Sequence, residues 1–247
     1  DVLARVEKGK YGDSEFFLGL YERLLLSVLI DSDWSDAAGF SERRPLPERL
    51  SEKNTLEIWN RSISHFETYM KKVGCSDPAG RLNQCRSEIS ESCYEASQSD
   101  KRLYRLTVPT GAGKTFSSLR FALYHAKKFK KRRILYVAPF NSILEQNAAE
   151  IRKAVGEESD VLEHHCNVCH DDTEKEKIYK KLTESWDSPI IVTTAVQMLN
   201  TLFSGQKSSI RRMYSLCNSI IIFDEVQAFP VRCTELFHLA VNFLVQF

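Results

Sequence analysis

The chain has 247 residues, 43% of them hydrophobic, and a formal net charge of +1, an ordinary globular composition that excludes a low-complexity chain. Residues 1–100 carry 13 Lys and Arg against 18 Asp and Glu, whereas residues 101–247 carry 21 against 15, so any polyanion is expected to bind the second part. Seven cysteines without regular spacing and the lack of a signal-peptide pattern favour reduced thiols in a cytoplasm.

The first part of the chain is predicted to be helical. The apolar stretch Phe16–Ile30 contains Glu22 and Arg23 and is shorter than the roughly 20 residues that span a bilayer. We therefore expect a buried helix and no membrane partner. A Pro-containing break at 42–54 separates it from a helix through 55–70, and a turn-rich stretch at 74–80 precedes another amphipathic helix.

The pattern changes at Lys101. Four short apolar runs alternate with helical stretches, at 102–108, 133–140, 189–195 and 219–225. This alternation predicts βαβ units and an α/β fold with a parallel sheet. We expect an N-terminal helical part at 1–70, a linker and helix at 71–100, and an α/β domain at 101–247.

The first run leads into the sequence VPTGAGKT (108–115), which a helical stretch follows. A strand, a glycine-rich turn, Lys-Thr and a helix form the loop that holds phosphates in nucleotide-binding proteins. Val108 departs from the usual pattern, in which a small residue stands there. The residues predicted to bind ATP are Pro109, Thr110, Gly111, Ala112, Gly113, Lys114 and Thr115.

The last run, SIIIF, ends on the adjacent acids Asp224 and Glu225. Acids at the end of a buried strand can be plain surface charges, but active sites of open α/β sheets lie at the carboxyl ends of strands. With the phosphate loop upstream, we expect Asp224 and Thr115 to hold Mg²⁺ and Glu225 to act as the catalytic base. The sequence therefore predicts a RecA-like nucleotide-binding domain.

The order PTGAGKT, VAPFNSILEQ, IIVTTAVQML and DEVQAFP resembles the first half of a superfamily-two helicase. This resemblance implies that single-stranded DNA contacts Pro139, Phe140, Asn141, Thr193, Thr194 and Gln197. It also implies that Gln227 couples the nucleotide state to a second helicase domain. Without the resemblance, Thr193 and Thr194 could equally be plain β-branched strand residues.

A narrower resemblance is to the CRISPR-associated helicase-nucleases of type I systems, the Cas-three family. It rests on DEVQAFP, VLEHHCN, the LNQCR helix and LLLSVLIDSDWSDAAGF. It implies that Asn83 and Arg86 assist ATP binding, and that 1–70 is the end of an HD nuclease domain. The HD-site ligand for a divalent transition metal would be Asp33, with Asp31 second and Asp36 third.

Two parts of that family's pattern are missing from this sequence. No histidine precedes His65, although an HD site needs several, and no later helicase motif follows Asp224 and Glu225. We therefore expect an internal piece of a longer enzyme.

Two other signals point elsewhere. The sequence CNVCH (166–170), with His164 and His165, matches haem-attachment and zinc patterns, but a local structural or DNA-proximal role for the histidines is favoured. The basic run KKFKKRR (127–133) is either a solvated face or a nucleic-acid patch.

The leading hypothesis is an ATP-dependent, single-stranded-DNA translocase and helicase coupled to a metal-dependent nuclease in antiviral CRISPR interference. Its partners would be single-stranded DNA and the RNA-guided surveillance complex, and the protein would be a monomer. The alternatives are a nucleotide-gated switch that binds a protein partner, and an RNA helicase of the same superfamily.

Overall fold

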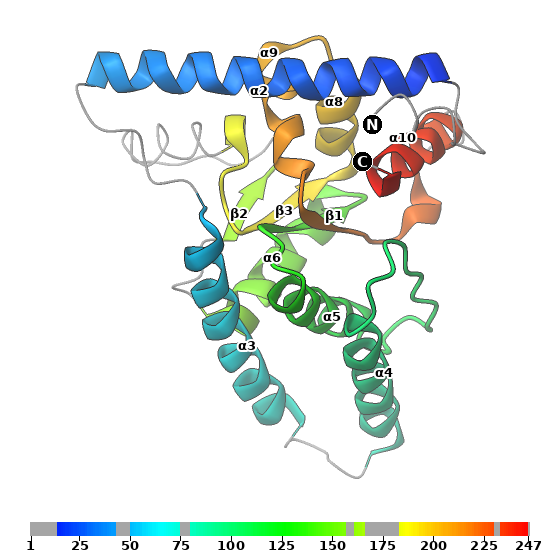
Figure 1. Cartoon of the computed structure of the whole chain (residues 1–247). Helices are drawn as coiled ribbons and strands as arrows, with labels where there is room; N and C mark the ends of the chain where they lie inside the picture. The colour runs from blue at the N-terminus through cyan, green and yellow to red at the C-terminus, as the bar shows by residue number, and fades with distance from the viewer. Residues whose placement is uncertain are drawn as a thin grey trace.

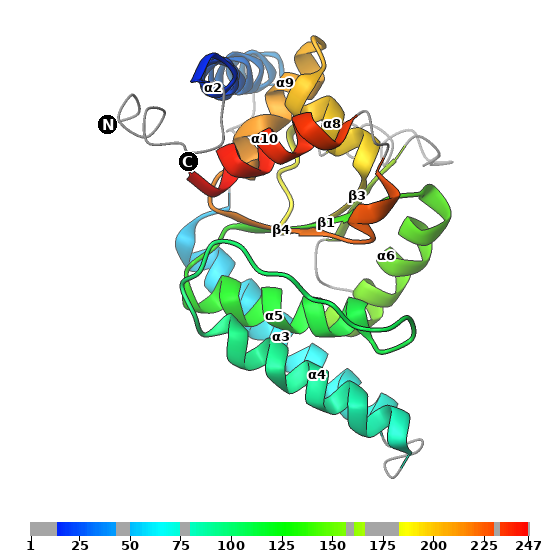
Figure 2. The same cartoon turned by 90° about the vertical axis from the view of Figure 1, so that its right-hand side faces the viewer.

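The computed structural model of the chain describes residues 14–42, 50–74, 80–156, 161–165, 183–229 and 233–246. These residues form a parallel β-sheet with helices packed on both faces, as the two perpendicular views in Figures 1 and 2 show. The fold is therefore α/β, with a RecA-like parallel sheet and a helical segment before it.

The sheet is built around β1 (Arg133–Ala138), which pairs in parallel with β3 (Ile190–Thr194) on one side and β4 (Ser219–Phe223) on the other. The short strand β2 (Val161–His164) pairs with β3, so the order is β2-β3-β1-β4. Every residue of β1 and β3 is buried. This burial explains why both strands are almost unbroken apolar runs in the sequence.

One face of the sheet is covered by four helices: α3 (Glu52–Gly74), α4 (Arg81–Ser97), α5 (Lys114–Lys128) and α6 (Asn141–Val155). Trp59 and Phe66 of α3 are almost fully buried and share one core with Ile134 and Tyr136 of β1. Helix α4 lies outermost and packs on α5 (Figure 2).

The other face is covered by α2 (Ser14–Glu42), α8 (Ala195–Phe203), α9 (Lys207–Arg211), the 3-10 turn η1 (Arg212–Leu216) and α10 (Thr234–Gln246). Its core includes Phe17, Trp186 and Phe243. Arg23 of α2 donates hydrogen bonds to the carbonyl oxygens of Thr201 (3.0 Å) and Ser204 (2.6 Å) at the end of α8. The long helix α2 is thereby attached to the sheet domain.

Two expectations from the sequence are wrong. Residues 102–108 are not a strand of the described sheet, and Leu103 is 66% exposed. Arginines and small polar residues alternate with its apolar residues, so this segment has too little apolar surface for a strand buried on both faces. Helix α2 is only half buried, because Phe17 and Leu20 face the sheet while Leu25 and Leu29 are exposed.

No helix among the described residues is both long enough and apolar enough to cross a membrane. The helices before residue 101 contribute to both cores of the sheet, through Phe17 on one face and Trp59 on the other. The domain boundaries proposed from the sequence stay predictions.

Shortening a core side chain of α3 tests whether this helix is part of the α/β core. Phe66→Ala removes a fully buried ring and is expected to lower the free energy of unfolding by about 3–5 kcal/mol, measured by denaturant titration. Glu57→Ala, on the exposed side of α3, is the control and is expected to change it by less than about 0.5 kcal/mol. An equally small effect of both changes would show that α3 folds apart from the sheet.

Candidate nucleotide site

The predicted phosphate loop and acid pair meet at the carboxyl edge of the sheet. Asp224 follows β4, and α5 begins at Lys114, directly after the loop. Because the strands are parallel, the segments that follow β1 and β3 reach the same edge. The structure thus brings together residues that lie more than 100 positions apart.

The loop depends on its two glycines. Gly111 and Gly113 have φ angles of 79° and 82°, in the left-handed region that residues with a Cβ rarely adopt. Arg86 of α4 lies against this turn and donates two hydrogen bonds to the carbonyl oxygen of Gly111, at 3.1 and 2.9 Å. Asn83 accepts a hydrogen bond from Arg86 at 3.3 Å and so fixes it. Arg86 therefore stabilises the conformation of the loop from α4.

Lys114 forms an ion pair with Glu225, with 2.6 Å between Nζ and Oε1. This hydrogen bond lowers the pKa of the Glu225 carboxyl from its ordinary value, so the group stays charged. The side-chain amide of Gln227 donates to the other oxygen of Glu225. Glu225 itself has a φ of 47°, a left-handed conformation that is uncommon for a residue with a Cβ. The predicted base and the predicted phosphate-binding lysine thus contact each other.

Asp224 is held by a tyrosine that the sequence analysis missed. The hydroxyl of Tyr136 donates to Oδ2 of Asp224 at 2.7 Å, and the Asp224 amide donates to the Val137 carbonyl at 2.9 Å. Burial and the Asp224 charge raise the pKa of Tyr136, which also contacts Thr115. Its signal in the sequence is the one hydroxyl in the apolar run RILYVA.

The Thr115 hydroxyl and the Asp224 carboxylate are therefore near each other, and both are hard oxygen donors of the kind that Mg²⁺ prefers. Within the described ranges there is no group of three or more His, Cys, Asp or Glu side chains that could hold a metal ion. This sparse set fits Mg²⁺, which binds through one or two protein ligands and keeps waters and phosphate oxygens as the others.

The residues predicted to contact DNA lie at the same edge, but with different exposure. Phe140 is 56% exposed, and Gln197 is partly exposed. Thr193 and Thr194 are buried, and their hydroxyls have internal partners. Thr193 donates to the His164 carbonyl, and Thr194 accepts from the main-chain N–H of Gln197. Pro139 and Asn141 are partly exposed. DNA contact by these six residues stays a prediction.

His164 has a structural environment. Its Nδ1 accepts a hydrogen bond from the Trp186 indole at 3.0 Å, and Arg212 lies beside the ring. Burial and the charge of Arg212 lower the pKa of His164 to about 3, so the ring is neutral at ordinary pH. His165 is buried next to Glu163. Residues 166–170, with the CNVCH pattern, lie outside the described residues.

The three acids considered for the HD metal lie along α2. Asp31 is 2% exposed and forms an ion pair with Arg211, with 2.9 Å between its Oδ1 and the arginine Nε. Asp33 and Asp36 are exposed. Asp31 thus has a structural role, whereas metal binding by Asp33 stays a prediction.

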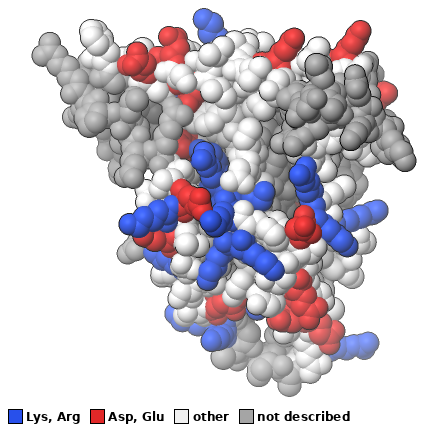
Figure 3. Space-filling view, viewed as in Figure 1, with Lys and Arg blue, Asp and Glu red and all other residues white. Residues whose placement is uncertain are grey.

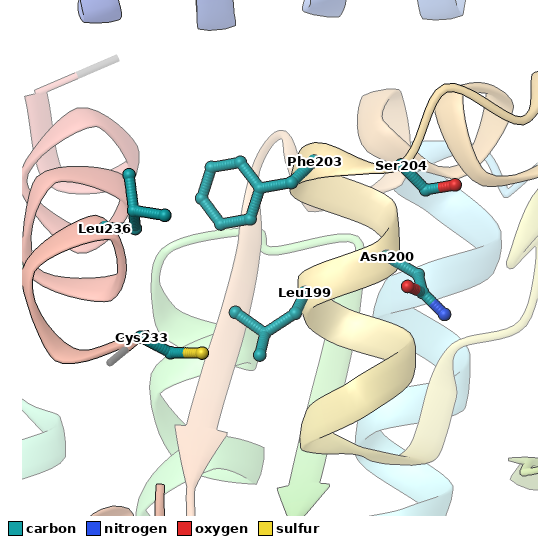
Figure 4. A pocket seen from close by; sticks show the side chains of 6 residues that line it. All are labelled: Leu199, Asn200, Phe203, Ser204, Cys233 and Leu236. Carbon is teal, nitrogen blue, oxygen red and sulfur yellow. The ribbon is translucent and has the colours of Figure 1, made fainter. Parts of the chain in front are cut away.

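A separate groove of about 380 Å³ lies between α8 and α10. Phe203 and Leu236 face each other across it, and Leu199, Asn200, Ser204 and Cys233 complete its lining (Figure 4). None of these residues belongs to the predicted site.

Comparison with known proteins places the site in a family. The family model described as "Type III restriction enzyme, res subunit" matches residues 79–230, more than half of the chain. The CRISPR-associated nuclease/helicase Cas3 of Haloferax volcanii is 29% identical over an aligned stretch of 148 residues that covers 51% of this chain. The match covers 16% of that relative's length.

The ion pair between Lys114 and Glu225 predicts an unusual effect of Glu225→Gln. Without the carboxylate, a nucleotide no longer competes for Lys114, so the affinity for Mg²⁺-ATP is expected to rise. An ion pair that solvent reaches, as this partly exposed one is, is worth about 0.2–1 kcal/mol, which corresponds to a gain in affinity of up to about five-fold. Titration with a fluorescent ATP analogue measures it, and Glu145→Gln on α6 is the control. A loss of binding would show that Glu225 holds the loop together.

Asp31 and Asp33 provide a matched pair of changes. Asp31→Ala leaves Arg211 without its ion-pair partner and is expected to lower the free energy of unfolding by about 3 kcal/mol. Asp33→Ala removes an exposed carboxylate and is expected to change it by less than about 0.5 kcal/mol. Denaturant titration of the two variants compares them directly, and equal effects would contradict the structural role of Asp31.

Proposed function

The chain belongs to the family of the type III restriction enzyme res subunit, and we propose that it is the first RecA-like domain of an ATP-dependent helicase. One observation supports this most strongly. The phosphate loop and the acid pair lie far apart in the sequence of the α/β part. In the fold they are in contact through Lys114 and Glu225. A chance string match in either motif does not require the two to meet.

We propose these roles for the site residues. The amides of the glycine-rich loop and the start of α5 face the phosphates, and Lys114 leaves Glu225 to neutralise their charge. Asp224 and Thr115 hold Mg²⁺, which offsets the charge that develops on the phosphates. Glu225, once released by Lys114, accepts the proton of the attacking water, and Gln227 keeps its carboxylate oriented.

Tyr136 is a positioning residue in this scheme. Its hydroxyl directs one oxygen of Asp224 and contacts Thr115, so it aligns the two Mg²⁺ ligands. Arg86 stabilises the turn of the loop by binding the Gly111 carbonyl. Assistance to ATP binding by Asn83 and Arg86 stays part of the proposal.

The likeness to Cas3 supports a more specific proposal. We place the chain in a DNA translocase that works in CRISPR interference in the cytoplasm, recruited by an RNA-guided complex. The exposed or partly exposed residues of the predicted set would follow the backbone of single-stranded DNA: Pro139, Phe140, Asn141 and Gln197. A coupled nuclease, with Asp33 at its metal site, and a monomeric state belong to the same proposal.

The test is ATP hydrolysis by the chain and by its Lys114→Ala variant. A second RecA-like domain supplies an arginine that is worth about 10³ to 10⁵ in rate. The 247-residue chain is therefore expected to bind Mg²⁺-ATP weakly and hydrolyse only a trace, with little stimulation by single-stranded DNA. Lys114→Ala is expected to abolish nucleotide binding, whereas Lys71→Ala on α3 keeps it.

Fusing the chain to a second RecA-like domain is expected to restore turnover that single-stranded DNA stimulates. Strong DNA-stimulated hydrolysis by the 247 residues alone would contradict the need for a second domain. Stimulation by RNA and not by DNA would favour an RNA helicase. Nucleotide binding without any stimulation in the two-domain protein would favour a nucleotide-gated switch.

A further inference from the structure

The opposite edge of the sheet carries a cluster of basic residues. Lys130, Lys131 and Arg132 precede β1, Lys128 ends α5, and Arg102 lies beside them. We call these five residues the amino-edge patch. In Figure 3 the Lys and Arg side chains gather in the middle of the view, at the level of α5 and the sheet. Most of the acidic side chains in that view lie above and below them.

The charges of the patch are mostly not neutralised by acids. Lys130 forms an ion pair with Glu52. Among the described residues, no carboxylate lies within ion-pair distance of the other four. Arg133, the last residue of the basic run, is buried and paired with Asp187, so it is not part of the patch. The fold therefore holds four positive charges close together outside any ion pair among the described residues, although the charge of Glu52 also acts on Arg132.

Two of these cations are nevertheless fixed in place by backbone carbonyls. Arg102 donates to the Val245 carbonyl at 2.9 Å, and Lys128 donates to the Gln98 carbonyl at 2.7 Å. Lys131 is partly buried, and burial together with the nearby charge of Arg102 lowers its pKa. Carbonyls position a cation but leave its net charge available, which favours binding of an anion.

The backbone under the patch is also fixed. The Lys131 amide donates to the Ala126 carbonyl, the Trp59 indole donates to the Lys131 carbonyl, and the Arg132 amide donates to the Asn218 carbonyl. These three bonds measure 2.9, 2.8 and 2.8 Å. The dipole of α5 stabilises cations only within the last turn of the helix. It can therefore explain why a basic residue stands at Lys128, but not why the other four residues of the patch are basic.

The aromatic residues next to the patch point to the kind of anion. Single-stranded nucleic acids bind on exposed aromatic rings that stack with bases. Here Tyr104, Phe121 and Phe129 surround the buried His125, with ring centroids 5.9, 5.2 and 4.4 Å from it. All three are partly buried, and Tyr104 and Phe121 also contact each other. The patch therefore offers charges for phosphates and no platform for bases.

We propose that the amino-edge patch binds the phosphate backbone of duplex DNA. This inference rests on the proposed function, in which the protein acts on DNA. The patch lies across the sheet from Asp224, and the six residues of β1 separate the two edges by roughly 20 Å. One helix connects the two places, since α5 begins at Lys114 and ends at Lys128. Duplex and nucleotide therefore bind at opposite ends of the domain.

The experiment measures fluorescence anisotropy of a labelled duplex of about 20 base pairs between about 50 and 200 mM NaCl, without nucleotide. The double variant Lys128→Gln/Arg132→Gln removes two exposed charges of the patch. Its affinity is expected to fall about ten-fold, and the slope of log K against log salt is expected to decrease in magnitude by about 2. The control Arg81→Gln/Lys207→Gln removes two exposed charges elsewhere and is expected to bind as the unchanged chain does.

Circular dichroism and Mg²⁺-ATP affinity are expected to be the same in all three proteins, because the changed side chains are exposed. An unchanged affinity of the patch variant, or an equal loss in the control, overturns the inference. The inference is also overturned if the patch variant loses affinity only for a labelled single-stranded oligonucleotide in the same assay. The same holds if the unchanged chain does not bind the duplex at the lowest salt concentration. A failure of Mg²⁺-ATP binding by the unchanged chain contradicts the proposed function instead, since the duplex assay contains no nucleotide.

Discussion

The positions of Asp224 and of the residues that follow β1 and β3 depend on β1. It is the one strand of the described sheet that pairs on both sides with long strands, and none of its side chains is accessible. Its register with β4 puts Val137 opposite Phe223, so that Asp224 emerges at the edge where β1 also ends. Its register with β3 puts Ala138 opposite Thr194. A shift of one residue would send side chains to the other face and separate these groups.

The chemical groups of the site are arranged by a few polar contacts made from this frame. Tyr136 points its hydroxyl from within β1 to Asp224, although the rest of its side chain is buried in an apolar core. A buried hydroxyl needs a hydrogen-bond partner, and here that partner is the acid. The same hydrogen bond therefore satisfies the buried hydroxyl of Tyr136 and orients the carboxylate of Asp224. Lys114 and Glu225 likewise satisfy each other through their ion pair.

Much of this arrangement could be predicted from the sequence, because parallel strands and glycine-rich loops leave strong local patterns. The runs at β1, β3 and β4 were identified from their apolar residues, and the loop from Gly111, Gly113 and Lys114. The pattern failed at 102–108, where apolar residues alternate with arginines and strand propensity alone was misleading. It also failed to show that Thr193 and Thr194 use their hydroxyls internally. The partner of Thr193 is the distant His164 carbonyl, whereas Thr194 caps the helix α8 that begins directly after it.

The attachment of α2 to α8 links two distant parts of the fold. The carbonyl groups at the end of a helix carry partial negative charge, and Arg23 places a partly buried guanidinium against those of α8. The first turn of α8 holds Gln197, which lies at the carboxyl edge of the sheet. Withdrawing α2 would expose these carbonyls and remove their counter-charge, which loosens α8 from its far end. Helix α2 therefore stabilises the carboxyl end of α8, the helix whose first turn carries Gln197.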